Sequence, residues 1–239
     1  MNWLIVIPAR LNSTRLKEKA LIDINGQTMI QRTYNCALNA VKDRNKIIIA
    51  TDSYKIYNHA RDFNAKVEIT PNNCLTGTDR VFEIAKKYEA SQYINLQGDE
   101  PIFPPEVIEY FIKEAQKNSS IVHTAVKEIF NKEQFLNKSI PKMVFSKSRK
   151  LLYSSRAPIP FNKSGTFQKA YKHICIYAYN KKHLKKFNSS EKSFFEKIED
   201  LEINRYLENN IEVNCIEVKK SGVAVDTLYD LNKVKEILQ

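Results

Sequence analysis

Glycine and cysteine are both scarce in this sequence, and their scarcity excludes several kinds of site. The 239 residues include five glycines, namely Gly26, Gly77, Gly98, Gly165 and Gly222. They lie so far apart that neither the dinucleotide-binding pattern Gly-x-Gly-x-x-Gly nor a Walker A loop is present. The four cysteines are Cys36, Cys74, Cys175 and Cys215. They form no Cys-x-x-Cys pair, which argues against a zinc site or a disulfide framework, so we expect four buried free thiols.

Long apolar runs are missing as well. No stretch approaches the roughly 18–20 residues that a membrane-spanning helix needs, and the start of the chain lacks the basic flank and the length of a secretory signal. A hydrophobic share of 43%, a charged share of 27% and a mean hydropathy of -0.45 are typical of a globular protein. We expect a cytoplasmic protein that does not bind membranes.

Acidic residues are too few to balance the basic ones, and the excess lies in the second half of the chain. The net charge is +11, of which residues 1–120 carry +2 and residues 121–239 carry +9. A basic surface attracts nucleic acids, but it equally attracts small polyanions. A basic nucleic-acid-binding protein is therefore one class of function to consider, and it predicts salt-dependent binding to oligonucleotides.

The first half alternates short β-branched runs with amphipathic stretches. The runs expected as buried strands are Trp3–Ile7, Lys46–Ala50, Lys66–Ile69 and Tyr93–Leu96. The stretches expected as helices are Met29–Val41, Tyr54–Phe63, Asp79–Tyr88 and Pro105–Lys117. This alternation predicts an α/β fold with a mostly parallel sheet. Ligands bind beyond the carboxyl ends of such strands, so chemistry is expected in the loops that follow Ile7, Ala50 and Leu96.

The second half alternates less regularly. Strands are expected at Ile121–Val126, Lys142–Phe145, Lys150–Ser154, Lys172–Tyr179 and Glu212–Val218, and helices at Phe194–Glu208 and Leu228–Leu238. The middle strands have little helix between them, which predicts an inserted antiparallel subdomain or a dimerisation arm. Because no repeat or flexible linker interrupts the chain, residues 1–239 are expected to form a single domain, with 140–179 as the inserted element.

The loop after the first strand is rich in cations. It reads Pro8-Ala9-Arg10-Leu11-Asn12-Ser13-Thr14-Arg15-Leu16-Lys17-Glu18-Lys19. Its three cations Arg10, Arg15 and Lys19 could neutralise a triphosphate while the hydroxyl groups donate hydrogen bonds. The segment could equally be a solvated basic loop, and the residues alone leave both interpretations open.

A carboxylate follows the strand Tyr93–Leu96, in the segment Gln97-Gly98-Asp99-Glu100-Pro101. Such an Asp suits Mg²⁺, which favours one or two carboxylates plus phosphate oxygens, although it can also simply stabilise a turn. Asp226 is a candidate partner carboxylate, or else an ordinary N-cap of the last helix. The segments Leu75–Arg80 and Ala50-Thr51-Asp52 offer N–H donors to an anion or a base, or only cap helices.

Taken in order, these segments resemble the CMP-Kdo synthetases (3-deoxy-manno-octulosonate cytidylyltransferases), a family of sugar nucleotidyltransferases. The similarity extends from Ile5 to about Leu238. The motifs that carry it are Ile7-Pro8-Ala9-Arg10, Ser13-Thr14-Arg15-Leu16, Lys19, Asp23-Ile24-Asn25-Gly26, Ala50-Thr51-Asp52, Gly77-Thr78-Asp79-Arg80, Gln97-Gly98-Asp99-Glu100-Pro101, Ser155-Arg156-Ala157-Pro158-Ile159-Pro160, His173, Tyr177 and Val225-Asp226-Thr227. The chain departs from the family in two places. Leu16-Lys17-Glu18-Lys19-Ala20-Leu21 lacks the usual glycine and prolines, and Cys175 replaces a glycine.

The resemblance implies a fold, an activity and partners. The implied fold is a Rossmann-like three-layer sandwich of the nucleotide-diphospho-sugar transferase type, and the implied assembly is a homodimer, with 140–179 as the sugar-binding and dimerisation element. The implied reaction uses Mg²⁺ and transfers CMP from CTP to the anomeric 2-hydroxyl of 3-deoxy-D-manno-octulosonate (Kdo), for lipopolysaccharide or capsule synthesis. Another ulosonic acid, 8-amino-Kdo or a nonulosonic acid, is the alternative substrate. A nucleic-acid partner is not implied and would leave the carboxylate of Asp99 unexplained.

The resemblance also assigns residues to roles. The implied CTP-binding residues are Pro8, Ala9, Arg10, Ser13, Arg15, Lys19, Ala50, Thr51, Asp52, Gly77, Thr78 and Arg80. Asp99 and Asp226 are implied to hold the metal, and with Arg10, Arg15 and Lys19 they make up the catalytic set. The implied sugar-binding residues are Gln97, Arg156, His173, Tyr177 and Glu202, with Arg156 meeting the substrate carboxylate.

Overall fold

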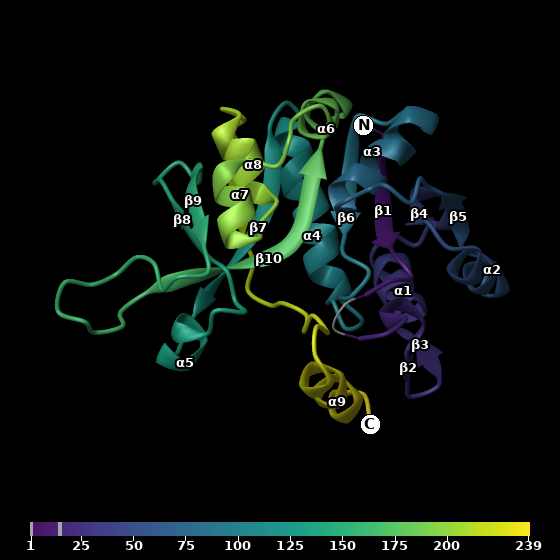
Figure 1. The fold of residues 1–239 in the computed structure, drawn as a ribbon, viewed down its shortest axis with the longest axis horizontal. Coiled ribbons are helices and arrows are strands. Elements are labelled where there is room, and N and C mark those ends of the chain that lie inside the picture. The colour runs from purple at the N-terminus through teal and green to yellow at the C-terminus, as the bar shows by residue number, and fades with distance from the viewer. Residues whose placement is uncertain (1, 14–15) are drawn as a thin grey trace.

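A mixed sheet runs through the centre of the molecule in the computed structural model, which describes residues 2–13 and 16–239 (Figure 1). Its main strands follow the order β11-β7-β10-β6-β1-β4-β5. Their bounds are β1 (Trp3–Ala9), β4 (Ile47–Thr51), β5 (Lys66–Ile69), β6 (Gln92–Leu96), β7 (Val122–Ile129), β10 (Ala170–Tyr179) and β11 (Val213–Glu217). Among these strands, β10 alone runs antiparallel to its neighbours. The prediction of a mostly parallel α/β sheet is therefore confirmed.

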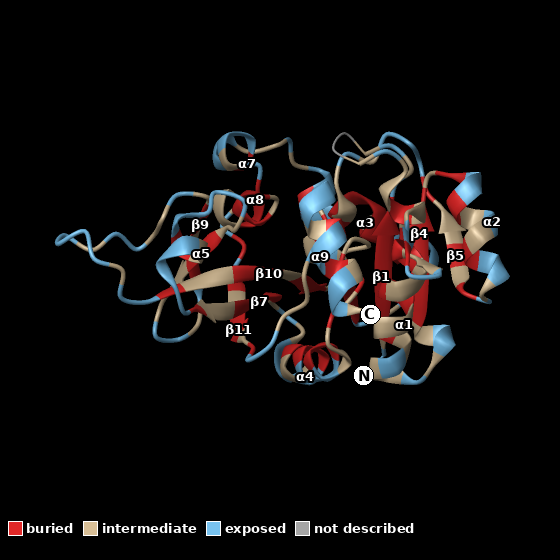
Figure 2. Cartoon of the chain, turned by 90° about the horizontal axis from the view of Figure 1, so that it is seen from below, coloured by how far each residue is buried: buried red, intermediate tan, exposed pale blue. Residues whose placement is uncertain are grey.

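Helices cover both faces of the sheet, because its strands alternate buried side chains between two cores. In β1, Ile5 and Ile7 join one core while Leu4 and Val6 join the other. The first core packs under α1 (Met29–Val41), α2 (Tyr54–Asp62) and α4 (Pro105–Ala115). The second packs under α3 (Gly77–Lys87), α6 (Lys181–Asn188) and α8 (Ile203–Glu208). The central strands β1 and β4 are buried between the two helical layers (Figure 2), as a three-layer sandwich requires.

A smaller antiparallel element extends from one end of this sheet (Figure 1). It contains α5 (Lys132–Leu136), β8 (Lys142–Phe145) and β9 (Leu151–Ser155), and β8 pairs with both β9 and β10. The side chain of Lys142 is fully buried at its base, where Nζ donates hydrogen bonds to the carbonyl groups of Asn137, Ile140 and Arg156 at 2.8–2.9 Å. Within residues 140–179, β8 and β9 form this element, whereas β10 belongs to the main sheet.

The C-terminal helix packs apart from the two main cores. Helix α9 (Leu228–Ile237) lies against the small hairpin of β2 (Asp23–Ile24) and β3 (Gln27–Thr28). The buried residues of this cluster are Ile24, Met29, Val225, Leu231 and Val234. In the part of the chain that the structure describes, no helix is both long and apolar enough to cross a membrane.

Several sequence expectations need correction. The helix predicted at Phe194–Glu208 is wrong as a single element, because Asp200 adopts a left-handed φ of 51° and separates α7 (Phe194–Glu199) from α8. Strand β1 continues to Ala9, two residues beyond the predicted end at Ile7. Of the four thiols, all are free but only Cys215 is fully buried, and the other three are half-buried.

Candidate active site

The loops after β1 and β6 meet at the carboxyl edge of the sheet. Strands β4, β1 and β6 are parallel neighbours, so their carboxyl ends share one edge. A Cβ atom on Gly98 would lie 2.6 Å from the carbonyl oxygen of Pro8, and one on Gly77 would lie 3.1 Å from the Pro8 ring. The absence of a side chain at Gly98 allows this close approach. The loops in which chemistry was expected therefore lie together.

Three of the predicted catalytic residues converge at this edge. The ammonium group of Lys19 donates a hydrogen bond to Asp99 Oδ2 at 2.7 Å and another to Asp226 Oδ1 at 2.9 Å. The side chain of Lys19 is 13% exposed, whereas those of Asp99 and Asp226 are 32% and 39% exposed. The cation of the site is thus largely buried, whereas its two carboxylates are accessible to solvent.

Backbone contacts bring these three residues together from distant parts of the sequence. Lys19 begins the short helix η1 (Lys19–Leu21) after the cationic loop. The N–H group of Val225 donates to the carbonyl oxygen of Asp99 at 2.9 Å, which fixes Asp226 beside the β6 loop. Thr227, not Asp226, is the N-cap of α9, through a capping box with Asp230. The alternative assignment of Asp226 as the N-cap is therefore wrong.

The electrostatics of the site are set by burial and by its carboxylates. Burial alone would lower the pKa of Lys19, but the charges of Asp99 and Asp226 outweigh it and raise that pKa. The next residue in the chain, Glu100, is 5% exposed, and its Oε2 atom has no hydrogen-bond partner among the described residues. Burial, with the negative charge of Asp99, raises the pKa of Glu100 to about 8. The burial of Glu100 has no signal in the sequence, because no apolar periodicity marks it.

Asp52 and Arg80 form a second polar centre beside the loop after β1. Asp52 Oδ2 accepts a hydrogen bond from Arg80 at 2.6 Å, and its Oδ1 accepts one from the backbone N–H of Leu11 at 3.3 Å. Arg80 is nearly fully buried and also donates to Thr70 Oγ1 at 2.7 Å and to the carbonyl oxygen of Pro71 at 3.3 Å. This network ties the ends of β4 and β5 to α3 and to the cationic loop. No sequence motif pointed to Thr70.

The other expected CTP-binding residues divide into two groups. The first group has buried side chains and can offer a ligand only backbone groups, and it consists of Pro8, Ala9, Ala50, Thr51 and Thr78. Thr78 lies within 3.3 Å of the hydroxyl of Tyr179, and Thr51 accepts a hydrogen bond from the N–H of Ser53. The second group is accessible: Arg10 is exposed and Ser13 is half-exposed. Arg15 lies outside the described residues.

His173 and Tyr177 lie on β10, next to the end of β6. Leu96, which precedes Gln97, pairs with Ile176 across the two strands. His173 Nε2 is 2.9 Å from Thr124 Oγ1, its Nδ1 has no hydrogen-bond partner among the described residues, and its ring contacts Tyr177 at 5.3 Å between centroids. Burial lowers the pKa of His173 to about 4, so the imidazole is neutral at physiological pH. Cys175 occupies an irregularity in the β10–β7 pairing.

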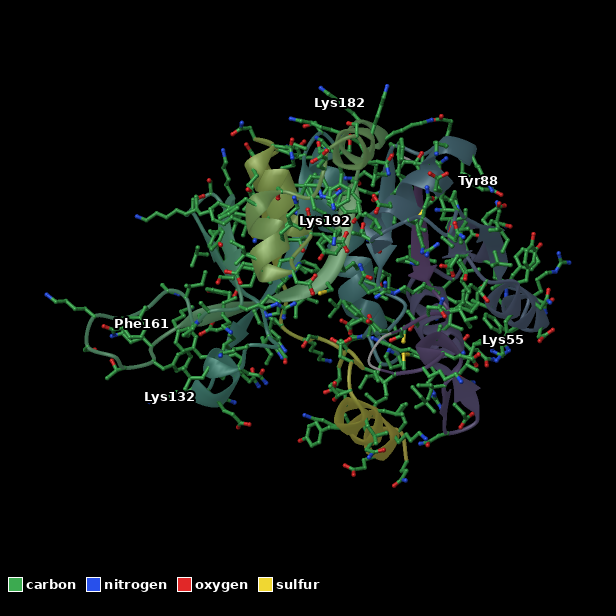
Figure 3. All side chains as sticks on the ribbon, in the orientation of Figure 1. Lys55, Tyr88, Lys132, Phe161, Lys182 and Lys192 are labelled. Carbon is green, nitrogen blue, oxygen red and sulfur yellow. The ribbon has the colours of Figure 1, made fainter. Side chains whose placement is uncertain are left out.

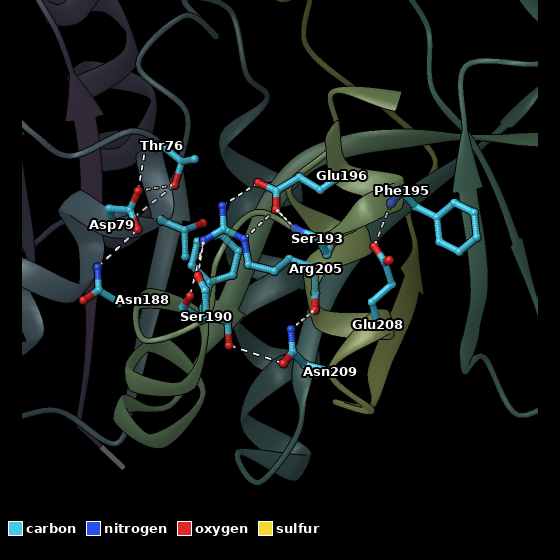
Figure 4. Close-up of polar contacts among 12 residues, drawn as sticks. Thr76, Asp79, Asn188, Ser190, Ser193, Phe195, Glu196, Arg205, Glu208 and Asn209 are labelled. Atoms are coloured by element: carbon cyan, nitrogen blue, oxygen red, sulfur yellow. Dashed lines mark hydrogen bonds and ion pairs between the residues drawn. The ribbon is translucent and has the colours of Figure 1, made fainter. Parts of the chain in front are cut away.

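Glu202 directly precedes α8, the helix that contains Arg205, and Arg205 lies at the centre of a polar cluster (Figure 4). Arg205 makes two contacts with Glu196, from Nε at 2.6 Å and from Nη2 at 2.5 Å, and both side chains are at most 4% exposed. Burial, together with the charge of Asp79, raises the pKa of Glu202. The buried ion pair joins α7 to α8 and thereby fixes the position of Glu202.

Arg156 is the one expected sugar-binding residue whose donors are already engaged with the protein backbone. Its guanidinium donates to the carbonyl oxygens of Glu199, Lys138 and Asp200 at 2.6, 3.2 and 3.2 Å. Its backbone N–H donates to Glu199 Oε2 at 2.9 Å. These contacts join the end of β9 to the turn between α7 and α8, whereas no described contact links Arg156 to Gln97, His173, Tyr177 or Glu202.

Comparison with known proteins identifies the family of this chain. Residues 4–219 match the family model described as Cytidylyltransferase. The 3-deoxy-manno-octulosonate cytidylyltransferase of Chloroherpeton thalassium is 40% identical over 244 residues, which covers 100% of this chain and 98% of that protein. The protein of the same name from Francisella tularensis subsp. novicida is 41% identical, with 98% and 97% covered.

Solved structures give the same assignment. A CMP:2-keto-3-deoxy-manno-octonic acid synthetase complexed with CTP superposes with a TM-score of 0.92 at 34% identity, over 100% of this chain and 98% of that one. HddC from Yersinia pseudotuberculosis, at 18% identity and a TM-score of 0.71 with both chains fully covered, shares the fold alone. The fold and the full-length identity together place this chain in the 3-deoxy-manno-octulosonate cytidylyltransferase family.

Proposed function

We propose that this protein transfers CMP from CTP to the anomeric 2-hydroxyl of Kdo and releases pyrophosphate. The observation that carries the proposal is the convergence of Lys19, Asp99 and Asp226 at the carboxyl edge of the sheet. Displacement at a phosphorus atom needs its developing charge neutralised by cations held in fixed positions. The full-length similarity to 3-deoxy-manno-octulosonate cytidylyltransferases supports the choice of nucleotide and sugar.

Mg²⁺ is the cofactor we assign to this site, with Asp99 and Asp226 as its protein ligands. Both carboxylates reach the same atom, Lys19 Nζ, so their oxygens are placed to share one small cation. The described residues contain no cluster of three or more His, Cys, Asp or Glu side chains suited to a metal. The two carboxylates of Asp99 and Asp226 fit Mg²⁺, which takes one or two carboxylates and completes its coordination shell with phosphate oxygens and water. When bound, Mg²⁺ neutralises charge on the phosphates and lowers the pKa of a nearby hydroxyl.

The chain's own residues bind and orient the two substrates. Arg10 and Lys19 stabilise the negative charge of the triphosphate and of the departing pyrophosphate. Asp52 and Arg80 fix the loop after β1, so that its backbone groups face the nucleotide. The neutral imidazole of His173 positions the sugar by hydrogen bonding rather than by charge. No side chain is required as a nucleophile.

Pyrophosphate release with CTP, Mg²⁺ and Kdo tests the function. Parallel reactions contain 8-amino-Kdo or a sialic acid, and release with only one of these would replace Kdo by that acid. Asp99→Asn and Asp226→Asn are each expected to lower the rate by at least about a hundredfold, because each removes a ligand of the metal that would neutralise the reacting phosphates. The matched control is Asp62→Asn, whose side chain is 78% exposed at the end of α2. Near-normal rates in both site variants would contradict the metal assignment.

The basic surface does not require a nucleic-acid partner. Lys55, Lys132 and Lys182 point outward at separate edges of the molecule (Figure 3). Several other lysines pair with carboxylates, including Lys87 with Glu68 and Lys220 with Glu106. Tight oligonucleotide binding together with indifference to CTP would favour the nucleic-acid class instead.

A homodimer is the assembly we propose, with β9 and α7 in the interface. Leu152, Phe194 and Ile198 expose 58%, 66% and 66% of their surfaces. The rings of Tyr153 and Phe195 are in contact at 5.4 Å, so β9 and α7 present these side chains on adjoining elements. Exposed apolar side chains on adjoining elements are typical of an interaction site. Light scattering at micromolar concentration should show a dimer that Phe194→Glu weakens, and a monomeric wild type would contradict the proposal.

A further inference from the structure

The ammonium group of Lys19 lies between the two carboxylates that we assign to the metal. It contacts Asp99 Oδ2 at 2.7 Å and Asp226 Oδ1 at 2.9 Å, and its own side chain is only 13% exposed. The two acids come from separate segments, the loop after β6 and the segment that precedes α9. The lysine therefore bridges two parts of the site that the metal would also bridge.

Two carboxylates that converge on one point repel each other unless a cation lies between them. The backbone bond from Val225 to Asp99 holds the two segments together, so the carboxylates cannot separate freely. A divalent cation and the ammonium group would therefore compete for the same negative charge. The two ions differ in charge, and the ammonium is tethered to the chain whereas the metal is not.

We propose that Lys19 is an internal substitute for the divalent cation, which holds Asp99 and Asp226 in place when no metal is bound and is displaced when the metal binds. The metal part of this inference rests on the proposed function. Displacement releases the ammonium group from the carboxylates and leaves it available to the triphosphate of CTP. Metal and nucleotide binding are then positively coupled, because each favours the same position of Lys19.

Mn²⁺ binding without nucleotide, measured by the electron paramagnetic resonance signal of the free ion, tests the exchange. Lys19→Met removes the competing cation, so its Mn²⁺ affinity should be at least about tenfold tighter than that of the wild type. Lys19→Arg keeps a cation and should stay close to the wild type. The matched control is Lys17→Met, which removes the same charge from an exposed side chain in the same loop and should change the affinity less than about twofold. Equal or weaker Mn²⁺ binding by Lys19→Met would overturn the proposal.

Thermal unfolding gives a second readout that does not depend on activity. In a chelator, Lys19→Met should unfold at a lower temperature than the wild type, and added Mg²⁺ should stabilise the variant more than it stabilises the wild type. If Lys19→Met does not fold, Lys19→Gln carries the same comparison, since it also removes the charge. Equal Mg²⁺-induced rises in the unfolding temperature of the variant and of the wild type would count against the exchange.

A double variant separates this inference from the proposed function. Asp99→Asn with Asp226→Asn should lose the Mn²⁺ site, and retention of wild-type binding would reject the metal assignment and the inference with it. If that site is lost while Lys19→Met binds Mn²⁺ like the wild type, only the role of Lys19 is wrong. Pyrophosphate release by the wild-type enzyme tests the reaction independently of either result.

Discussion

The buried ion pair between Glu196 and Arg205 gives the sharpest prediction about stability. The guanidinium of Arg205 meets both carboxylate oxygens of Glu196, at 2.6 and 2.5 Å, and neither side chain is more than 4% exposed. Arg205 also donates to the carbonyl oxygen of Phe187 at 3.3 Å and lies over the ring of that residue, 3.7 Å from its centroid. Arg205→Met keeps much of this packing but leaves the charge of Glu196 buried without its counter-ion.

The cost follows from the burial of the remaining charge. Breaking a buried pair by removing one partner costs about 3–5 kcal/mol, because an uncompensated charge stays in a low-dielectric environment. For a chain of this size each kcal/mol lowers the melting temperature by about 2–4 °C, so the expected loss is roughly 6–20 °C. Replacing both residues, as Glu196→Leu with Arg205→Met, removes the stranded charge and should recover much of the loss.

Denaturant unfolding followed by circular dichroism measures these changes in the free energy of unfolding. The control is Lys220→Met, which breaks an ion pair with Glu106 in which the side chains are 69% and 58% exposed, and which should cost less than about 1 kcal/mol. A loss below about 1 kcal/mol for Arg205→Met would refute the reasoning. A double variant no more stable than Arg205→Met would show that packing, not charge, carries the cost.

Two further predictions concern the site. Gly98→Ala places a Cβ atom 2.6 Å from the carbonyl oxygen of Pro8, so the loops after β1 and β6 must separate. The value of kcat/KM for pyrophosphate release should therefore fall roughly tenfold to a hundredfold with little change in fold. An unchanged rate would mean that the loops tolerate the shift. His173 has its pKa lowered from 6.5 to about 4 by burial, so the stability that it contributes is present above pH 6.5 and is lost as the pH falls toward 4. That loss amounts to about 3 kcal/mol. Denaturant unfolding at a series of pH values should therefore show that the free energy of unfolding of His173→Gln falls less steeply with decreasing pH than that of the wild type. Equal slopes would show that His173 is not a buried neutral imidazole in the folded state.

The strands of the sheet could be predicted from sequence because burial on both faces leaves a strong local signal. The run of Ile47 to Ile49 is fully buried in β4, and β1 divides its side chains between two cores. Such runs can be predicted without knowledge of long-range contacts, since strands buried between two helical layers are apolar on both faces. The predicted ends were less accurate, because the last residues of a strand depend on its neighbours.

The break between α7 and α8 depends on a distant residue, and the sequence alone did not reveal it. Phe194, Ile198 and Leu201 have helical spacing across the break, which predicts one continuous helix. The turn at Asp200 instead presents two carbonyl groups to the guanidinium of Arg156, which comes from the end of β9. A contact between residues so far apart in sequence carries no local pattern. The same reason explains why the burial of Glu100 was not foreseen.

The motifs identify candidate site residues but not the physical reason that three of them meet. Asp226 follows Val225, which is buried in the small cluster beneath α9, and Leu16 packs against the same cluster from the loop that leads to Lys19. The C-terminal segment and the cationic loop are therefore held together by one apolar cluster, and their charged residues meet at its edge. Although Leu16–Leu21 lacks the family's glycine and prolines, this packing keeps Lys19 within reach of both carboxylates. Apolar packing, rather than the exact sequence of the motif, sets the geometry of these three charged residues.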